Sequence, residues 1–142
     1  MRAVLDTNVL VAGLCSQQGA SHALLRHVLA RRLHIVAVPA LWLEYEDVLK
    51  RAEIQRMHRL PVDEIDAFLD ALAILVEPVS VNYLWRPQLR DPKDEVFFET
   101  ALNAGVDALV TFNQRDFQPA ATAFRLPLLR PAACLALLEK TP

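Results

Sequence analysis

Short runs of apolar residues alternate along the chain with longer stretches in which apolar residues recur every three or four positions. The runs have the length and composition of buried β-strands. Ala108–Phe112 is the clearest of them, whereas the run at Leu75–Val81 is interrupted by Pro78. The strands predicted from this pattern are Arg2–Leu5, Ile35–Val38, Leu75–Val81, Ala108–Phe112 and Leu126–Leu129.

Helices are predicted between these runs. Pro39 can occupy the first position of a helix because its missing N–H costs nothing there, and Gly105 can end a helix as a left-handed cap. The predicted helices cover about Ala20–Arg31, the segment after Pro39, Val62–Ile74, the segment from Asp91 to Gly105, and Pro131–Leu138.

The alternation of strands and helices predicts one α/β domain over residues 1–142, built as three α/β/α layers around a central parallel sheet. Right-handed crossovers bring the carboxyl ends of parallel strands to one edge, where open α/β sheets usually bind ligands. Candidate chemistry is therefore expected at residues that follow strands.

Four acidic residues are expected near that edge. Asp6 and Asp116 each follow a predicted strand, while Glu44 and Asp94 are expected in the first turns of helices. Each has a structural explanation when taken alone: a helix cap for Asp6 and Asp94, an exposed helix face for Glu44, and a solvated turn for Asp116. Their joint occurrence favours a shared site.

A shared carboxylate site predicts a bound divalent cation. Crowded carboxylates repel one another, and protonation or a cation relieves the repulsion. Oxygen ligands without His or Cys suit a hard ion such as Mg²⁺ or Mn²⁺. Such an ion can deprotonate a bound water and neutralise charge on a phosphoryl oxygen, which points to the hydrolysis of a phosphodiester.

Several motifs, in this order and spacing, resemble those of the PIN-domain family, the fold of many VapBC-type toxin nucleases. The resemblance covers nearly the whole chain. It is carried by VLDTNVL at 4–10, LEY at 43–45, Asp94 with Ala101 and Gly105, and VTFNQRDF at 110–117.

The resemblance implies a PIN-like fold and assigns roles to particular residues. Asp6, Glu44 and Asp94 take three acidic positions and Asp116 the fourth. Many relatives have an acid where Asn113 stands, so the fourth position is open between Asp116 and Asn113. The supporting polar residues around the metal would be Thr7, Asn8, Thr111 and Asn113.

The function implied is that of an endoribonuclease that depends on Mg²⁺ or Mn²⁺ and acts as the toxin of a toxin–antitoxin pair. Its expected partners are RNA, a small antitoxin protein that blocks the site, and a second copy of the chain. A homodimer also fits the surplus of apolar residues.

Two other functions are compatible with parts of the pattern. Asp6 could be the nucleophile of an aspartyl-phosphate phosphohydrolase, although such enzymes place a second Asp two residues later, where this chain has Asn8. The chain could also be a catalytically inactive module that binds RNA or protein. The presence of all four acids disfavours that alternative, because a binding surface does not need a carboxylate cluster.

Composition changes this picture in small ways. With 54% hydrophobic residues and a net charge of −2, the chain is not expected to bind nucleic acid over its whole surface. Twelve Arg against three Lys favour local phosphate contacts, because Arg is the better bidentate partner.

Cys15 and Cys134 are expected as buried free thiols in a reducing cytoplasm. No targeting or membrane segment is expected, and Trp85 could anchor the core or contact RNA.

Overall fold

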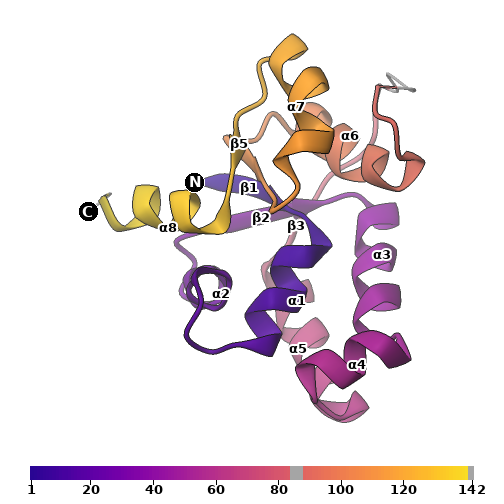
Figure 1. Ribbon diagram of the computed structural model, residues 1–142, viewed down its shortest axis with the longest axis vertical. Coiled ribbons are helices and arrows are strands. Elements are labelled where there is room, and N and C mark those ends of the chain that lie inside the picture. Colours follow the sequence, from indigo (N-terminus) through magenta and orange to yellow (C-terminus); the bar gives the residue numbers. More distant parts are fainter. Residues whose placement is uncertain (84–87, 141–142) are drawn as a thin grey trace.

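Five parallel strands form the centre of the computed structural model, which describes residues 1–83 and 88–140 (Figure 1). Their order across the sheet is β3-β2-β1-β4-β5, and every pair of neighbours is parallel. The strands are β1 (Arg2–Leu5), β2 (His34–Ala37), β3 (Glu77–Pro78), β4 (Ala108–Val110) and β5 (Leu128–Leu129).

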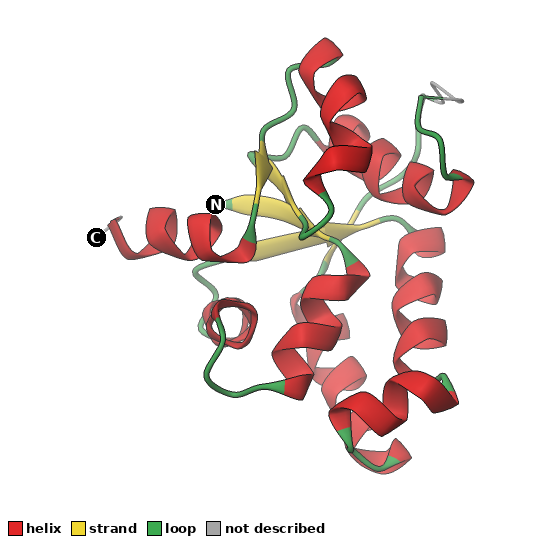
Figure 2. Cartoon of the chain, viewed as in Figure 1, coloured by secondary structure: helices red, strands yellow, loops and turns green. Residues whose placement is uncertain are grey.

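Helices cover both faces of this sheet. In the view of Figure 2, α6 and α7 lie above the sheet, while α1, α2 and α5 lie below it. The predicted three-layer α/β/α architecture is therefore confirmed. The helices are α1 (Thr7–Cys15), α2 (Ala20–Leu29), α3 (Pro39–Leu49), α4 (Ala52–His58), α5 (Val62–Leu75), α6 (Glu95–Ala104), α7 (Gln114–Ala123) and α8 (Pro131–Lys140), with a short 3₁₀ turn η1 (Pro92–Asp94) before α6.

The central strand β1 is the point from which the chain builds the sheet in two directions. β2 and β3 lie on one side of β1, and β4 and β5 lie on the other. Residues Ala3, Val4 and Leu5 of β1 are fully buried between the helical layers. A reversal of strand order opens a crevice at the carboxyl ends of the strands that flank it. In this chain that position lies after β1 and β4.

Several elements differ from the prediction. β3 contains only two residues, since Pro78 lacks an N–H with which to extend the pairing. α7 was not predicted because it contains Pro119, a residue that normally disrupts helices. Cys15 was expected to be buried but is exposed at the end of α1, whereas Cys134 is buried as expected. Trp85 lies outside the described residues.

No helix in the described part of the chain combines the length and apolar character needed to cross a membrane.

The end of α6 depends on the backbone freedom of Gly105. Gly105 caps this helix with φ +61°, and a Cβ added there would meet no atom within 4 Å. A side chain at position 105 would therefore destabilise the protein only through the strain of its positive φ, and not through a steric clash. We expect Gly105→Ala to lower the free energy of unfolding by about 1 kcal/mol in urea denaturation.

The matched control is Gly19→Ala. Position 19 has equally open space around it, but its φ is −82° and suits any residue. We expect a change of less than about 0.5 kcal/mol for this variant. Equal destabilisation by the two substitutions would contradict the backbone explanation.

Candidate functional site

Asp6 is buried where β1 and β4 end. Its residue is only 5% exposed, and Thr111, which follows β4, is fully buried. The Thr111 hydroxyl donates a hydrogen bond of 2.7 Å to Oδ2 of Asp6, and the backbone N–H of Asp6 donates to the carbonyl of Val110 at 2.9 Å. Side chain and backbone together fix this carboxylate at the predicted edge of the sheet.

A capping role does not explain the Asp6 side chain. Asp6 occupies the N-cap position of α1 by its backbone, yet its carboxylate makes no capping hydrogen bond. Burial raises the pKa of this carboxyl above its ordinary value, and the hydrogen bond from Thr111 opposes the shift, with smaller opposing contributions from the backbone of Asn8 and Thr7. A buried acid that does not cap its helix is a candidate for chemistry.

Asp94 shares an electrostatic environment with Asp6. It is half-buried at the end of η1 and makes no capping hydrogen bond. Burial, followed by the charges of Asp6, Asp91, Asp116 and Glu95, raises the pKa of Asp94 from 3.8 to about 6. The capping role belongs to Asp91, whose carboxylate accepts from the N–H of Lys93 at 2.9 Å.

Asp116 is connected to Asp6 through two hydrogen-bonded residues. The side-chain amide of Asn113 donates to Oδ2 of Asp116 at 2.7 Å, and the backbone N–H of Asn113 donates to the Thr111 hydroxyl at 2.9 Å. That hydroxyl donates onward to Asp6. Asp116 lies in the first turn of α7 and is exposed, so it stands at the outer end of this series.

Tyr45, the residue after Glu44, attaches α3 to β1. The fully buried Tyr45 donates its hydroxyl proton to the carbonyl of Leu5, the residue before Asp6. Burial and the charge of Asp6 raise the pKa of Tyr45 further, which keeps this donor protonated.

Glu44 itself differs from the prediction in two respects. It lies in the second turn of α3, since that helix begins at Pro39, and not in the first turn as expected. Asp47 raises the pKa of Arg51 through a hydrogen bond and its charge, and Glu44 adds a smaller contribution. Glu44 is not among the residues whose charges raise the pKa of Asp94.

Of the four predicted supporting residues, two make hydrogen bonds to the acids through their side chains. Thr111 and Asn113 link the acids as described above. Thr7 is 5% exposed and its hydroxyl has no hydrogen-bond partner among the described residues. Asn8 is exposed on α1.

Glu95 was given no role in the site from the sequence alone. It is 3% exposed, and its Oε1 accepts the backbone N–H groups of Gln88 and Leu89 at 2.8 and 2.9 Å. Its Oε2 has no partner among the described residues. The available signal was the excess of acid around Asp94, which is more than capping requires. Glu95 holds the segment before η1 against α6.

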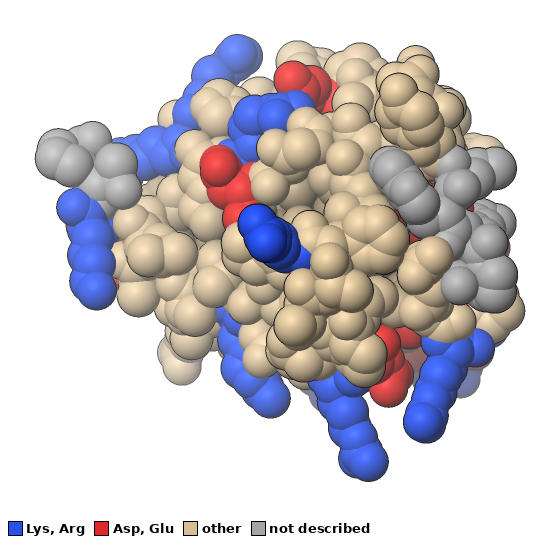
Figure 3. Space-filling model, turned by 90° about the horizontal axis from the view of Figure 1, so that it is seen from above, with Lys and Arg blue, Asp and Glu red and all other residues tan. Residues whose placement is uncertain are grey.

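The candidate metal ligands have the chemistry that a hard divalent cation prefers. The candidate ligands are oxygen atoms only, neighbouring carboxylates contribute to the raised pKa of Asp94, and the Thr7 hydroxyl beside Asp6 is unpartnered among the described residues. Across residues 1–83 and 88–140, however, no three Asp, Glu, His or Cys side chains are grouped closely enough to enclose an ion. Figure 3 likewise shows the acidic side chains on one face as small, separate patches.

The fold is that of a three-layer α/β/α domain with a parallel sheet at its centre. A family model described as PIN domain matches residues 2–115, and the chain belongs to the PIN-domain family. Members of this family are generally nucleases that use divalent metal ions. The match includes Asp6, Glu44, Asp94 and Asn113 and ends one residue before Asp116. Neither the curated proteins nor the solved structures gave a match.

The raised pKa of Asp94 makes a prediction about stability. The folded state binds the Asp94 proton more tightly than the unfolded state, so the free energy of unfolding falls as pH rises from about 4 through about 6. Asp94→Asn removes this penalty. In EDTA at neutral pH, we expect the variant to melt roughly 1–4 °C above the wild type, after allowance for the solvent exposure of Asp94.

The control is Asp70→Asn, which neutralises an exposed carboxylate on α5. Its melting temperature should change little with respect to the wild type over the same pH range. The advantage of Asp94→Asn should largely vanish at pH 3, because the Asp94 carboxyl of the wild type is then mostly protonated in both the folded and the unfolded state. A lower melting temperature for Asp94→Asn at neutral pH would contradict the assigned repulsion.

Proposed function

We propose that this protein is an endoribonuclease that uses Mg²⁺ or Mn²⁺ to hydrolyse phosphodiester bonds of RNA. The observation that carries the proposal is the burial of the Asp6 carboxylate where β1 and β4 end, near enough to Asp94 that its charge, after the effect of burial, helps to raise the pKa of Asp94. Family membership supports the same reaction class.

Asp6 and Asp94 would hold the metal ion, with Asp116 and Glu44 as further ligands. The bound ion would activate a water molecule and offset negative charge on the attacked phosphate. Carboxylates bind cations in their ionised form. The pKa of about 6 at Asp94 therefore means that cation and proton compete for this group below neutral pH.

The remaining residues orient these ligands. Thr111 fixes Oδ2 of Asp6 by a hydrogen bond. Asn113 does the same for Asp116 through its side-chain amide. This arrangement favours Asp116, held by Asn113, as the acid of the fourth position. The exposed position of Asp116 suits a ligand that engages when substrate arrives.

The toxin–antitoxin role is part of the proposal and concerns partners. An antitoxin protein and a second copy of the chain would cover apolar side chains that are exposed on α3, α4 and α5. The largest exposures among them belong to Leu43, Met57, Val62 and Ile74. Apolar residues exposed on neighbouring helices are typical of protein–protein interfaces. The substrate RNA and the antitoxin would be encountered in the cytoplasm.

The experiment compares cleavage of single-stranded RNA with Mn²⁺ and with EDTA. We expect the wild-type protein to cut RNA only with the metal. Asp6→Asn and Asp94→Asn should each lower the cleavage rate by at least about 100-fold, because each removes a charge from the metal site. Labelled RNA fragments resolved on a denaturing gel provide the rate.

Further variants distinguish the ligands from one another. Asp70→Asn, remote from the site, should cleave at the wild-type rate. Asp116→Asn should cost more than Asn113→Ala if Asp116 is the fourth ligand. Cleavage that persists in EDTA, or in Asp6→Asn, would exclude metal-dependent chemistry at this site. A phosphate covalently attached to Asp6 would instead identify the aspartyl-phosphate phosphohydrolase.

A further inference from the structure

A groove of about 410 Å³ lies next to the carboxylates, between residues 88–90 and the first turns of α7. Arg90 lines one side of it, and Arg115 and Asp116 line the other. Asp116 is also joined to Asp6 by the hydrogen bonds of Asn113 and Thr111. The groove therefore borders the proposed metal site at Asp116.

Both walls of the groove are fixed by buried or hydrogen-bonded groups. Glu95, itself 3% exposed, holds the wall that carries Arg90 by accepting the N–H groups of Gln88 and Leu89. The opposite wall is the start of α7, where Asn113 donates to Asp116. The relative placement of the two arginines is thus a property of the folded chain.

Neither guanidinium is neutralised by a salt bridge within the described residues. Arg90 and Arg115 are exposed, and the salt bridges found in that part of the chain involve Arg2, Lys50 and Arg51 instead. Two such guanidinium groups that line one groove form a binding site for an anion with several oxygen atoms, because each can donate two hydrogen bonds to a phosphate.

We propose that Arg90 and Arg115 bind the backbone phosphates of single-stranded RNA that flank the bond to be cut. The inference rests on the proposed function for the identity of the ligand. The groove also offers the apolar side chains of Leu89 and Pro119, which suit contact with a ribose or a base. On a chain with a net charge of −2, attraction for a polyanion must come from local basic groups of this kind.

The test measures RNA binding separately from cleavage. A short fluorescein-labelled single-stranded RNA is titrated with protein in EDTA, and fluorescence anisotropy gives the dissociation constant over a series of KCl concentrations. We expect Arg90→Gln and Arg115→Gln each to weaken binding by about fivefold to tenfold. The slope of log K against log salt should become shallower by about 0.7 for each phosphate that the variant no longer binds.

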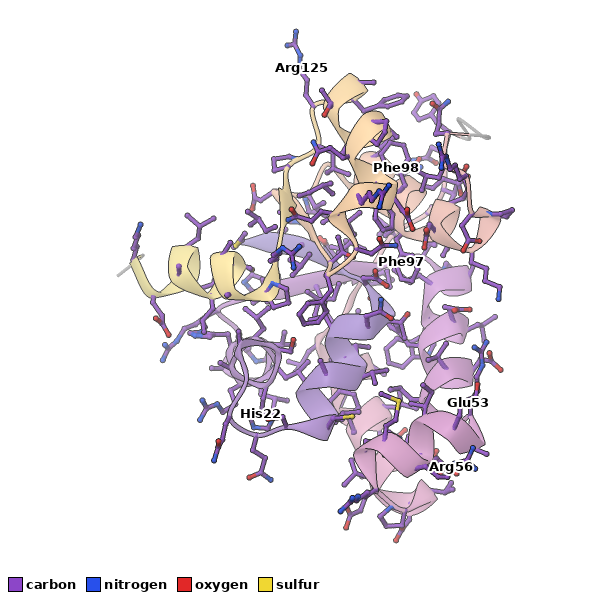
Figure 4. All side chains as sticks on the ribbon, in the orientation of Figure 1. His22, Glu53, Arg56, Phe97, Phe98 and Arg125 are labelled. Atoms are coloured by element: carbon purple, nitrogen blue, oxygen red, sulfur yellow. The ribbon has the colours of Figure 1, made fainter. Side chains whose placement is uncertain are left out.

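The matched control is Arg125→Gln. Arg125 is exposed beyond the carboxyl end of the same helix, and in Figure 4 its side chain points away from the body of the molecule. This variant should bind RNA like the wild type. Arg90→Lys and Arg115→Lys keep the charge and should retain most of the salt slope, which guards against a loss caused by misfolding.

The outcomes separate this inference from the proposed function. Weaker binding by the two Gln variants, together with RNA that is never cut in Mn²⁺, would support the groove and reject the nuclease. Metal-dependent cleavage with unchanged binding by both variants would overturn the groove and leave the nuclease intact. Equal weakening by Arg125→Gln would also overturn the proposal, since it would indicate attraction by overall charge alone.

Discussion

The burial of the Asp6 carboxylate at the junction of β1 and β4 is the constraint on which the rest of the site depends. A carboxylate in this position loses most of its hydration, and the Thr111 hydroxyl together with the backbone of Asn8 and Thr7 compensates for only part of that loss. A parallel sheet whose order reverses at β1 offers this position because the ends of two neighbouring strands meet there. The desolvation cost of the Asp6 carboxylate therefore arises at the edge of the sheet where a ligand can reach this group.

Helices carry the other acids, and buried polar groups fix those helices to the sheet and to the preceding segment. Tyr45 attaches α3 to the last carbonyl of β1, so Glu44 has a defined position relative to Asp6. Glu95 attaches residues 88 and 89 to α6, directly after Asp94. In both cases a side chain contacts the backbone of another segment, and a candidate ligand is its neighbour in the sequence. Rigid placement of this kind is what a preorganised site requires.

The amino-acid sequence was sufficient to predict the parallel sheet and the residues after its strands, because apolar runs and helical spacing depend on local burial. It could not predict α7, since Pro119 argues against a helix that tertiary packing of Phe117 and Ala121 nevertheless stabilises. The sequence named Thr111 and Asn113 as supporting residues only by resemblance. Their hydrogen bonds to Asp6 and Asp116 depend on the turn between β4 and α7, and such geometry is not encoded in spacing alone. The same limit hid Arg90 and Arg115, which lie 25 positions apart in the chain and on one groove in the fold.

An acidic site that acts on a polyanion must overcome its own electrostatic field. The carboxylates that raise the pKa of Asp94 would repel an RNA phosphate for the same reason that they repel one another. A divalent cation between them reverses the field at the reacting phosphate, but its effect on the next phosphates of the strand is weakened by distance and salt. Those phosphates need fixed positive charge outside the carboxylate group. Under the proposed function, Arg90 and Arg115, which line the groove beside Asp116, would supply this charge. Separate positions for the acidic and basic groups would therefore follow from the charge of the proposed RNA substrate.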